Sequence, residues 1–479
     1  MTLGKTLFFY FSVLIYAVGC LLISALTVRQ KPSLRPRGHT DLYFAAFLLT
    51  AVISCVASDY RADAFSGQDG RYMGLLTFLF IGCAYLFITR CGQITKPVAY
   101  IFGASMIFMS VVSLLQFRGF DPLSLYKGTQ QTVRINFMSL VGNKDVYYSY
   151  LALTVPFAMY LACTAAEMKE QLFWLAAAFF GFGGALACNS EGVHLALIPA
   201  FALLFFTGCR DKNGLLRVLR CLLAFFAAAL LVALIKPDLS SFGIIESAVL
   251  RHLVLPVPCL CALAATALAH VAAAKLNPPP VFYKCLRIAV ALLLGAALAA
   301  LLAAFVCFTF FDTEKNLGSL TEFFRFDGVL WGNKRGYVWS RLLQLYHEFP
   351  LPRKLIGSGE ETVGILLRNA FGDEMKQKTG LTFDNAHNEF LQYLVTHGLL
   401  GLIAYLLLAG SAIRDGVKTG GRFQKAAALC CVCYLAQSFV NISQSITTPL
   451  FFVFLALTQT TAAETQPPVA SVTRQTGRR

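Results

Sequence analysis

Long apolar stretches alternate with short polar segments along nearly the whole chain. The runs LFFYFSVLIYAVGCLLISAL (7–26) and IAVALLLGAALAALLAAFVCFTFF (288–311) are typical of them, and a helix of about 20 apolar residues spans a bilayer. The first run is longer than the apolar core of a cleavable signal and precedes a basic flank, so we expect a retained helix. About thirteen spans (12–14) are predicted in this way, over 7–26, 41–57, 72–89, 97–115, 147–163, 171–188, 192–208, 218–235, 252–274, 288–310, 387–411, 426–443 and 446–463.

The pattern therefore predicts an all-α polytopic membrane protein. Its N-terminal transmembrane bundle covers 1–310, and its C-terminal membrane helices cover 386–463. The tail 464–479 is polar and contains Pro and Thr, so we expect it to be disordered and cytoplasmic.

One long polar segment, 311–385, separates the tenth and eleventh predicted spans; we call it the long loop. It carries ten Lys and Arg and ten Asp and Glu, and it is too long for a plain connector. Its stretch YVWSRLLQLYHEF (337–349) has an apolar helical face, which is typical of a helix at a membrane surface. That face comprises Trp339, Leu342, Leu343, Tyr346 and Phe349. A second amphipathic segment follows over 361–377, so we predict a helical loop.

Composition excludes one class of protein, and the placement of charge predicts the orientation in the bilayer. Charged residues make up only 14% of the chain, against about 25% in soluble domains, which excludes a large soluble core. Of the short connections, one alternating set with the tail holds 21 Lys and Arg and the other set holds 9. The positive-inside rule makes the first set cytoplasmic, so the C-terminus is predicted inside and the long loop outside. The net charge of +15 is then explained by orientation in the bilayer, and no nucleic-acid partner is expected.

Most of the fifteen cysteines lie within apolar runs. The cluster Cys430, Cys431 and Cys433 leaves a metal site open, but no His or second Cys pair stands nearby at zinc spacing. Small buried side chains in membrane helices are the favoured interpretation, and no metal site is predicted.

A polar cluster opens the eleventh span in FDNAHNEFLQYLVTHGLLG (383–401). Asp384 or Asn385 is expected to cap the helix, with Asn388 or Glu389 in its first turn, and Asn388 and Glu389 are themselves further candidate caps. Glu389 is also placed to orient His387. The helix dipole favours a neutral imidazole at this end, and a neutral imidazole is what a general base needs.

The spacing H-N-x-x-L-x(6)-G-x-x-G runs from His387 and Leu391 to Gly398 and Gly401. Placed after a long external loop, it closely resembles the signature of the O-antigen ligase and O-antigen polymerase superfamily. GNKRGYVWSRLLQLYHEFPLPRKLIGSG (332–359) and VGNKDVYYSYLAL (141–153) resemble further segments of that family. The resemblance covers roughly 130–410.

The resemblance implies a membrane glycosyltransferase without a cofactor or metal. Its donor is a glycan on a polyprenyl (undecaprenyl) pyrophosphate carrier, and its acceptor is a hydroxyl of a glycan, lipid or glycolipid. The reaction takes place on the outer face of the bacterial cytoplasmic (inner) membrane. His387 matches the base, and Arg335 matches the arginine that holds pyrophosphate, which a guanidinium does bidentately. A donor-binding role for Lys144 and Arg341 competes with interfacial anchoring and with an ordinary solvated position.

One position departs from the family pattern. Members often carry Ser-Arg-Gly in a short external turn, whereas this chain reads Asn189-Ser190-Glu191-Gly192. Either Lys144, Arg134 or Arg341 supplies the missing charge, or the donor, the reaction or the level of activity differs. A salt bridge from Glu191 to Lys or Arg is the structural alternative. Asn143 and Glu191 are therefore expected to support the site rather than to bind the donor.

Two further functions compete with ligation. A polymerase of the same superfamily extends the glycan on its own carrier, and the sequence does not separate it from a ligase. A lipid-linked oligosaccharide flippase belongs to another class and needs charged residues along a path through several spans. The predicted spans are nearly free of acids and bases, which favours the enzyme.

Overall fold

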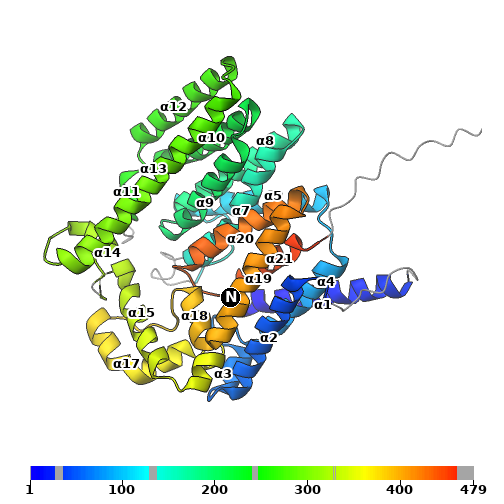
Figure 1. Ribbon diagram of the computed structural model, residues 1–479, viewed down its shortest axis with the longest axis vertical. Helices are drawn as coiled ribbons and strands as arrows, with labels where there is room; N and C mark the ends of the chain where they lie inside the picture. Colours follow the sequence, from blue (N-terminus) through cyan, green and yellow to red (C-terminus); the bar gives the residue numbers. More distant parts are fainter. Residues whose placement is uncertain are drawn as a thin grey trace, which may run out of the picture.

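The computed structural model describes residues 2–26, 36–128, 137–239, 246–326, 328–329 and 331–460. Every regular element within these ranges is helical (Figure 1). The N-terminal part contains α1 (Thr2–Leu26), α2 (His39–Ala57), α3 (Arg61–Ser66), α4 (Leu75–Cys91), α5 (Lys96–Phe117), α7 (Lys144–Thr164), α8 (Met168–Ala187), α9 (Gly192–Gly208), α10 (Lys212–Ile235), α11 (Ala248–His252), α12 (Pro256–Lys275) and α13 (Pro280–Val306), which η2 (Cys307–Phe311) continues. The remainder contains η3 (Gly318–Leu320), α14 (Thr321–Phe324), α15 (Trp331–Glu348), α16 (Leu351–Ile356), α17 (Val363–Thr379), α18 (Glu389–Thr396), α19 (Gly398–Lys418), α20 (Arg422–Ser438) and α21 (Thr448–Thr458).

Helices occupy all thirteen predicted spans, so the all-α class is confirmed within the described residues. Nine helices there are long and apolar enough to cross a membrane. Three more, α4, α9 and α21, are apolar but shorter, and α20 has 17 residues. The chain is therefore a multi-pass membrane protein, while the exact number of crossings stays a prediction.

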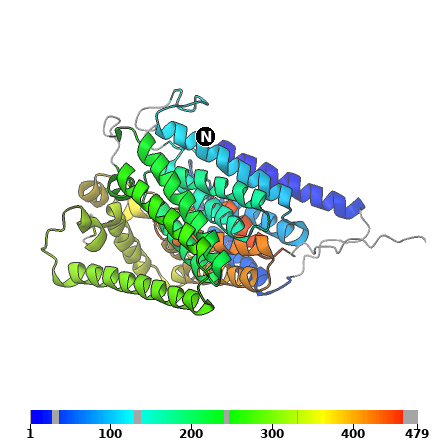
Figure 2. The same cartoon turned by 90° about the horizontal axis from the view of Figure 1, so that it is seen from above.

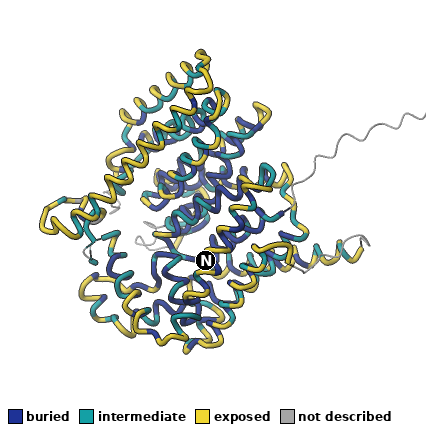
Figure 3. The backbone as a smooth tube through the Cα atoms, in the orientation of Figure 1, coloured by how far each residue is buried: buried dark blue, intermediate teal, exposed yellow. Residues whose placement is uncertain are grey.

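The centre of the bundle is α7. It packs against α8, α9 and α20, and large side chains such as Tyr147, Tyr148 and Trp174 are almost completely buried around it. By contrast, α12 and α13 lie at the periphery with mostly exposed residues (Figures 2 and 3). α12 packs along α10, but most of its surface and nearly all of that of α13 stay exposed. Such apolar surface is stable in lipid, which agrees with membrane insertion.

The connections gather at two opposite ends of the bundle. At one end, Lys5 of α1 donates to the Val141 carbonyl (2.5 Å), and Thr6 bonds to Ser445 (2.7 Å). Ser445 lies beside Arg71, which contacts the last residues of the long loop. We call this the long-loop end. The opposite end holds the Arg90–Asp41 and Arg422–Glu170 ion pairs (both 2.6 Å). The full topology, and which end is cytoplasmic, stay predictions.

The long loop has an apolar core of its own. Leu342 of α15, with Val363 and Leu367 of α17, is fully buried in it, and the core continues onto Leu391 and Val395 of α18. The apolar face predicted for 337–349 therefore packs mainly against protein. Leu343 is the one member of that predicted face that is exposed.

The eleventh predicted span, 387–411, is two helices rather than one. It begins at Glu389 and breaks between Thr396 and Gly398, where Gly398 has φ +71°. A Cβ at Gly398 would lie 2.3 Å from the Leu355 carbonyl oxygen, and one at Gly357 would lie 2.1 Å from the Thr396 carbonyl oxygen. The Gly-x-Gly turn of the long loop is thus pressed against this break, which only glycine permits.

Backbone hydrogen bonds hold the turn in that place. The Ser358 N–H donates to the Val395 carbonyl, and the Gly359 N–H donates to the Thr396 carbonyl, both at 3.0 Å. Two carbonyls at the end of α18 are thereby satisfied by the long loop instead of by the next helical turn. The helix pair α18–α19 and the long loop consequently form one structural unit.

Candidate active site

His387 lies in a tight turn just before α18. Its backbone has φ +47°, a conformation that few residues other than glycine adopt. The Asn385 side chain accepts the His387 N–H at 2.7 Å. The Asn388 side chain accepts the Leu391 N–H at 3.0 Å, so Asn388 is the N-cap of α18. The expectation of Asn388 as a cap is confirmed, whereas Asp384 and Asn385 do not cap this helix, because the chain turns once more before the helix begins.

Three side chains from outside the turn hold it in place. Gln392 accepts the Ala386 N–H at 3.0 Å, and the Trp339 indole donates to the Ala386 carbonyl at 2.9 Å. Arg71 donates to the Asp384 carbonyl at 3.0 Å and also forms an ion pair with the Asp384 carboxylate. The imidazole is therefore presented by a rigid turn, as a catalytic base requires.

Arg335 begins the regular part of α15. The three preceding residues, Gly332 to Lys334, have φ between +56° and +70°, and the Arg335 guanidinium donates back to the Gly332 carbonyl at 3.1 Å. Its Nε is buried without a hydrogen-bond partner in the described structure. No carboxylate of the described residues lies within 4 Å of it. The guanidinium is thus able to take an anionic ligand.

The charge of Arg335 acts on the partly buried imidazole of His387. Burial lowers the pKa of His387 to about 4, and the positive charges of Arg335 and Arg71 lower it further, while Asp384 opposes them. An imidazole with this pKa is neutral at physiological pH. The geometry thus combines a neutral base with a positive charge that has no carboxylate partner.

The start of α7 forms another side of the site. Asn143 caps this helix by accepting the N–H groups of Asp145 (2.8 Å) and Val146 (3.2 Å). Lys144 and Arg335 both act electrostatically on the Asp145 carboxylate, which places the first turn of α7 opposite α15. Asn143 therefore has a structural role, and Lys144 lies beside the site. Arg134 lies outside the described residues.

Arg341 is engaged elsewhere. Its guanidinium forms an ion pair with Glu374 of α17 and lies over the rings of Tyr337 (5.4 Å) and Phe371 (5.2 Å). These contacts tie α15 to α17 within the long loop. The structure does not bring Arg341 together with His387, and its guanidinium already has a carboxylate partner.

Glu389 points into the bundle. Its buried carboxylate accepts the hydroxyls of Tyr405 (2.7 Å) and Tyr434 (3.1 Å). The prediction that Glu389 orients His387 is not supported, because both carboxylate oxygens are used by these tyrosines.

Glu191 caps the neighbouring helix α11. Its carboxylate accepts the Ala248 N–H at 2.8 Å, and the Asn189 side chain accepts the Ser247 N–H at 2.6 Å. No Lys or Arg among the described residues forms a salt bridge to Glu191, and a salt bridge to Arg134 stays a prediction. The Glu191 turn still borders the site, because Gly192 packs against the Tyr148 ring, which is electrostatically coupled to Arg335.

The sequence interpretation missed Arg71 and Glu361. Arg71, which is 8% exposed, pairs with Asp384 and lies 3.8 Å from the Glu361 carboxylate. Burial raises the pKa of Glu361 to about 7, although Arg71 lowers it. In the sequence, Arg71 is a single arginine in the segment QDGRYMG (68–74), which is predicted to be external. No motif spacing relates it to His387.

A second buried pair was also missed. The Glu360 carboxylate contacts the His397 imidazole, and both side chains are buried. His397 stacks on Phe47 of α2 with ring centroids 5.0 Å apart. The sequence gives no spacing that relates His397 to Glu360 of the long loop. The pair fixes the Gly-x-Gly turn to the break between α18 and α19.

The three cysteines of the cluster, Cys430, Cys431 and Cys433, are buried side chains of α20. No group of three or more metal-ligating side chains is found where the structure is described.

The fold defines a multi-pass helical membrane protein, and the candidate site residues His387 and Arg335 lie at its long-loop end. Residues 259–406 match the family model described as O-antigen ligase. This segment contains both His387 and Arg335, and the match confirms the predicted resemblance to the O-antigen ligase and polymerase superfamily. It supports a membrane enzyme of that general kind. No curated protein matches the chain.

Proposed function

We propose that this protein transfers a glycan from a polyprenyl pyrophosphate carrier to an acceptor hydroxyl. The reaction takes place at the long-loop end, on the extracytoplasmic face of a bacterial cytoplasmic membrane. The observation that carries the proposal is a partly buried, neutral His387 imidazole within the electrostatic influence of Arg335. A neutral imidazole accepts a proton, and a guanidinium without a carboxylate partner binds a phosphate leaving group.

The proposed step is a single displacement. The acceptor oxygen attacks the anomeric carbon of the donor sugar, and His387 takes the proton from that oxygen. The bond between the anomeric carbon and the pyrophosphate oxygen breaks, and polyprenyl pyrophosphate leaves with the bonding electrons. Arg335 holds the charge that develops on this leaving group, which is the electrostatic stabilisation that lowers such barriers most.

Arg71 takes a positioning role in this scheme. Its hydrogen bond and ion pair hold Asp384, three residues before the base, so it fixes the turn that carries His387. Its charge also adds to the positive potential around the imidazole. We propose that Arg71 in this way offsets the arginine that the family pattern has at position 191. Lys144 is the remaining candidate for a direct donor contact.

A ligase is the first candidate, and a polymerase of the same superfamily is the second. Turnover of defined polyprenyl-pyrophosphate glycans by the purified protein, with sizing of the products, separates them. One added chain on a foreign acceptor supports the ligase, whereas a ladder of lengths on the carrier supports the polymerase.

A flippase is the alternative from another class. It predicts movement of the intact donor between leaflets without any new glycosidic bond. Product sizing in sealed vesicles therefore also decides between transport and transfer, since transport alone leaves the donor unchanged.

A further inference from the structure

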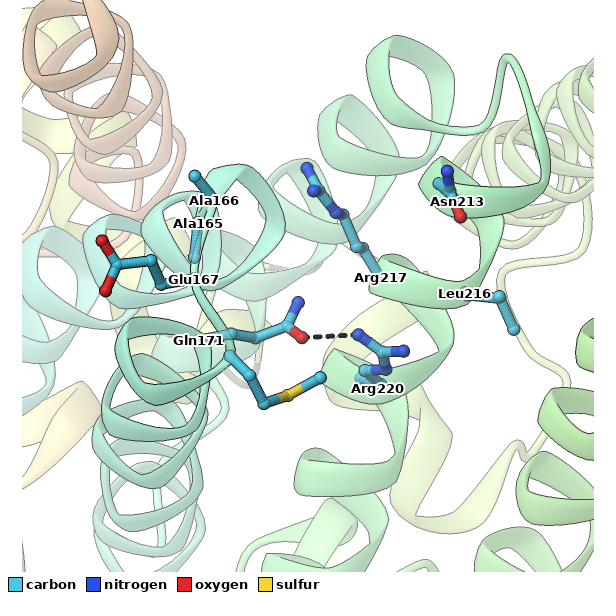
Figure 4. Close-up of a pocket in the computed structure, with 9 residues that line it drawn as sticks. Ala165, Ala166, Glu167, Gln171, Asn213, Leu216, Arg217 and Arg220 are labelled. Carbon is cyan, nitrogen blue, oxygen red and sulfur yellow. Dashed lines mark hydrogen bonds between the residues drawn. The ribbon is translucent and has the colours of Figure 1, made fainter.

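A second cluster of arginines lies at the opposite end of the bundle, far from His387. α7 begins beside the candidate site at Lys144 and ends at Thr164, and a cavity of about 220 Å³ lies just beyond its end. The turn between α7 and α8 forms one wall, and the first turns of α10 form the other. Arg217 and Arg220 lie on the α10 side (Figure 4).

The two arginines are held by neutral groups. Arg217 donates to the Cys163 carbonyl at the end of α7 (2.9 Å), and Arg220 donates to the Gln171 side chain (2.5 Å). Gln171 is itself fixed by its bond to the Ala162 carbonyl (3.0 Å). Each guanidinium has five N–H donors, so most of them stay available to a ligand in the cavity.

No carboxylate neutralises this pair within the described structure. Glu167 is the one acidic residue among those lining the cavity, and its carboxylate points away from both arginines (Figure 4). Arginines nearby are paired, Arg422 with Glu170 (2.6 Å) and Arg90 with Asp41 (2.6 Å). Two adjacent positive charges one helical turn apart repel each other, and an anion between them relieves that cost.

The size and position of the cavity select the kind of anion. Its volume is below that of pockets for drug-sized ligands, but it accommodates a phosphate with a short attachment. Met168 and Leu172 of α8, which start beside the cavity, are 58% and 57% exposed, and they offer an apolar surface for acyl chains. Basic pockets between helices at the membrane boundary are typical sites for anionic lipid head groups.

We propose that the cavity between the α7–α8 turn and α10 binds the phosphate of an anionic phospholipid head group. Arg217 and Arg220 are its ligands, and the acyl chains lie along the exposed face of α8. The site is independent of the proposed glycan transfer, since it rests on a different part of the bundle.

Native mass spectrometry of the purified full-length protein tests this proposal, with phosphatidylglycerol and phosphatidylcholine titrated in parallel. Wild type is expected to bind phosphatidylglycerol more tightly. The double variant Arg217→Gln/Arg220→Gln is expected to lose at least about tenfold in that affinity, because two charge-assisted contacts disappear. Glutamine retains a donor for the Cys163 carbonyl, so the end of α7 stays capped.

Arg414→Gln is the matched control. Arg414 is an exposed arginine at the same end, paired with Asp415 at 3.1 Å, and its loss is expected to leave lipid affinity unchanged. Should the double variant not fold, Arg220→Gln alone is expected to weaken binding in the same direction. Unchanged lipid preference in the variants, or equal binding of both lipids by wild type, would overturn the proposal. If inorganic phosphate stabilised the protein as much as phosphatidylglycerol does, the assignment of the cavity to a lipid would be overturned.

Discussion

At the level of single residues, the site is defined by an imidazole that its surroundings keep neutral. Burial and two neighbouring guanidinium groups place the pKa of His387 at about 4. Such a group stays unprotonated throughout the physiological range, but it is a weak base while the site is empty. Bound pyrophosphate would compensate the charges of Arg335 and Arg71 and so raise this pKa.

This leads to a prediction for the pH dependence of transfer. The acid limb of kcat/KM, which reports the free enzyme, is expected near pH 4. The acid limb of kcat, which reports the donor complex, is expected at higher pH. Both are measured from initial rates across the pH range. An acid limb of kcat/KM close to the ordinary histidine value, about 6.5, would contradict the proposed environment of His387.

Arg335 and Arg341 form a matched pair for mutation, since both lie on α15. Arg335→Lys keeps the charge but loses bidentate geometry, and we expect the transfer rate to fall about 10²-fold or more. Arg341→Lys is expected to change the rate by less than about threefold, because Arg341 is bound to Glu374. Initial rates of transfer at saturating donor, measured for both variants and wild type, test these two expectations. Equal losses for the two variants would show that Arg335 has no special role.

Glu361 gives a prediction for stability. Its pKa is raised from 4.5 to about 7 in the folded protein, so the folded state binds this proton more tightly than the unfolded state. Its contribution is therefore fully present below pH 4.5 and is lost as the pH rises through 7, by about 3 kcal/mol at most. The lowered pKa of His387 changes stability with pH in the opposite direction. The contribution of Glu361 is therefore measured as the difference in stability between wild type and a Glu361 variant.

Glu361→Gln is expected to remove the Glu361 contribution. The melting temperature of wild type minus that of the variant should fall between pH 5 and pH 7.5. Parallel melting curves across this range would mean that the carboxylate titrates as it does in the unfolded chain.

At the level of helices, the sequence predicted positions well because apolar runs in a membrane protein must be helical to satisfy their backbone groups. The start of the eleventh span was less well predicted. Asn388 was recognised as a first-turn residue, but the extra turn at His387 depends on bonds from Gln392 and Trp339. The latter arrives from the distant α15, and no local pattern encodes it.

The break between α18 and α19 was missed for the same reason. Gly398 was placed inside one continuous span, 387–411, whereas it adopts φ +71° against the Gly-x-Gly turn. The apolar periodicity of a segment does not show which residues some 40 positions away will pack against it.

Gly398→Ala tests this account of the signature glycine. A Cβ there meets backbone atoms and the φ is unfavourable, so we expect a loss of at least about 1–3 kcal/mol and reduced transfer. Gly410→Ala is the control in the same helix, because a Cβ at Gly410 has nothing within 4 Å. Thermal melting in detergent should separate the two. Similar melting temperatures for both variants would show that the break is not fixed by Gly398.

At the level of the whole molecule, the long loop and the bundle meet through buried charged groups. Glu360 contacts His397, and Arg71 joins Asp384 and Glu361. Such groups are costly to bury unless each has a partner. The long loop is therefore docked in one specific position, in which the charge of Arg335 acts on His387.

The sequence predicted His387 and Arg335 through the resemblance, and in the structure the charge of Arg335 acts on the His387 imidazole. It could not predict Arg71, because the relevant contact joins residues 71 and 384. Nor could it predict the use of Glu191 as a cap for α11, which depends on how residues 246–252 fold back. Charge counts predict the orientation in the membrane, and the side on which the site lies stays a prediction.

The most direct test of the central claim is single-turnover transfer by His387→Asn. Asparagine tolerates the positive φ of this position, so the turn is retained while the base is removed. Our account predicts a transfer rate lower by about 10²–10⁴-fold, with donor affinity and melting temperature close to those of wild type. Transfer at the wild-type rate would contradict the assignment of His387 as the base.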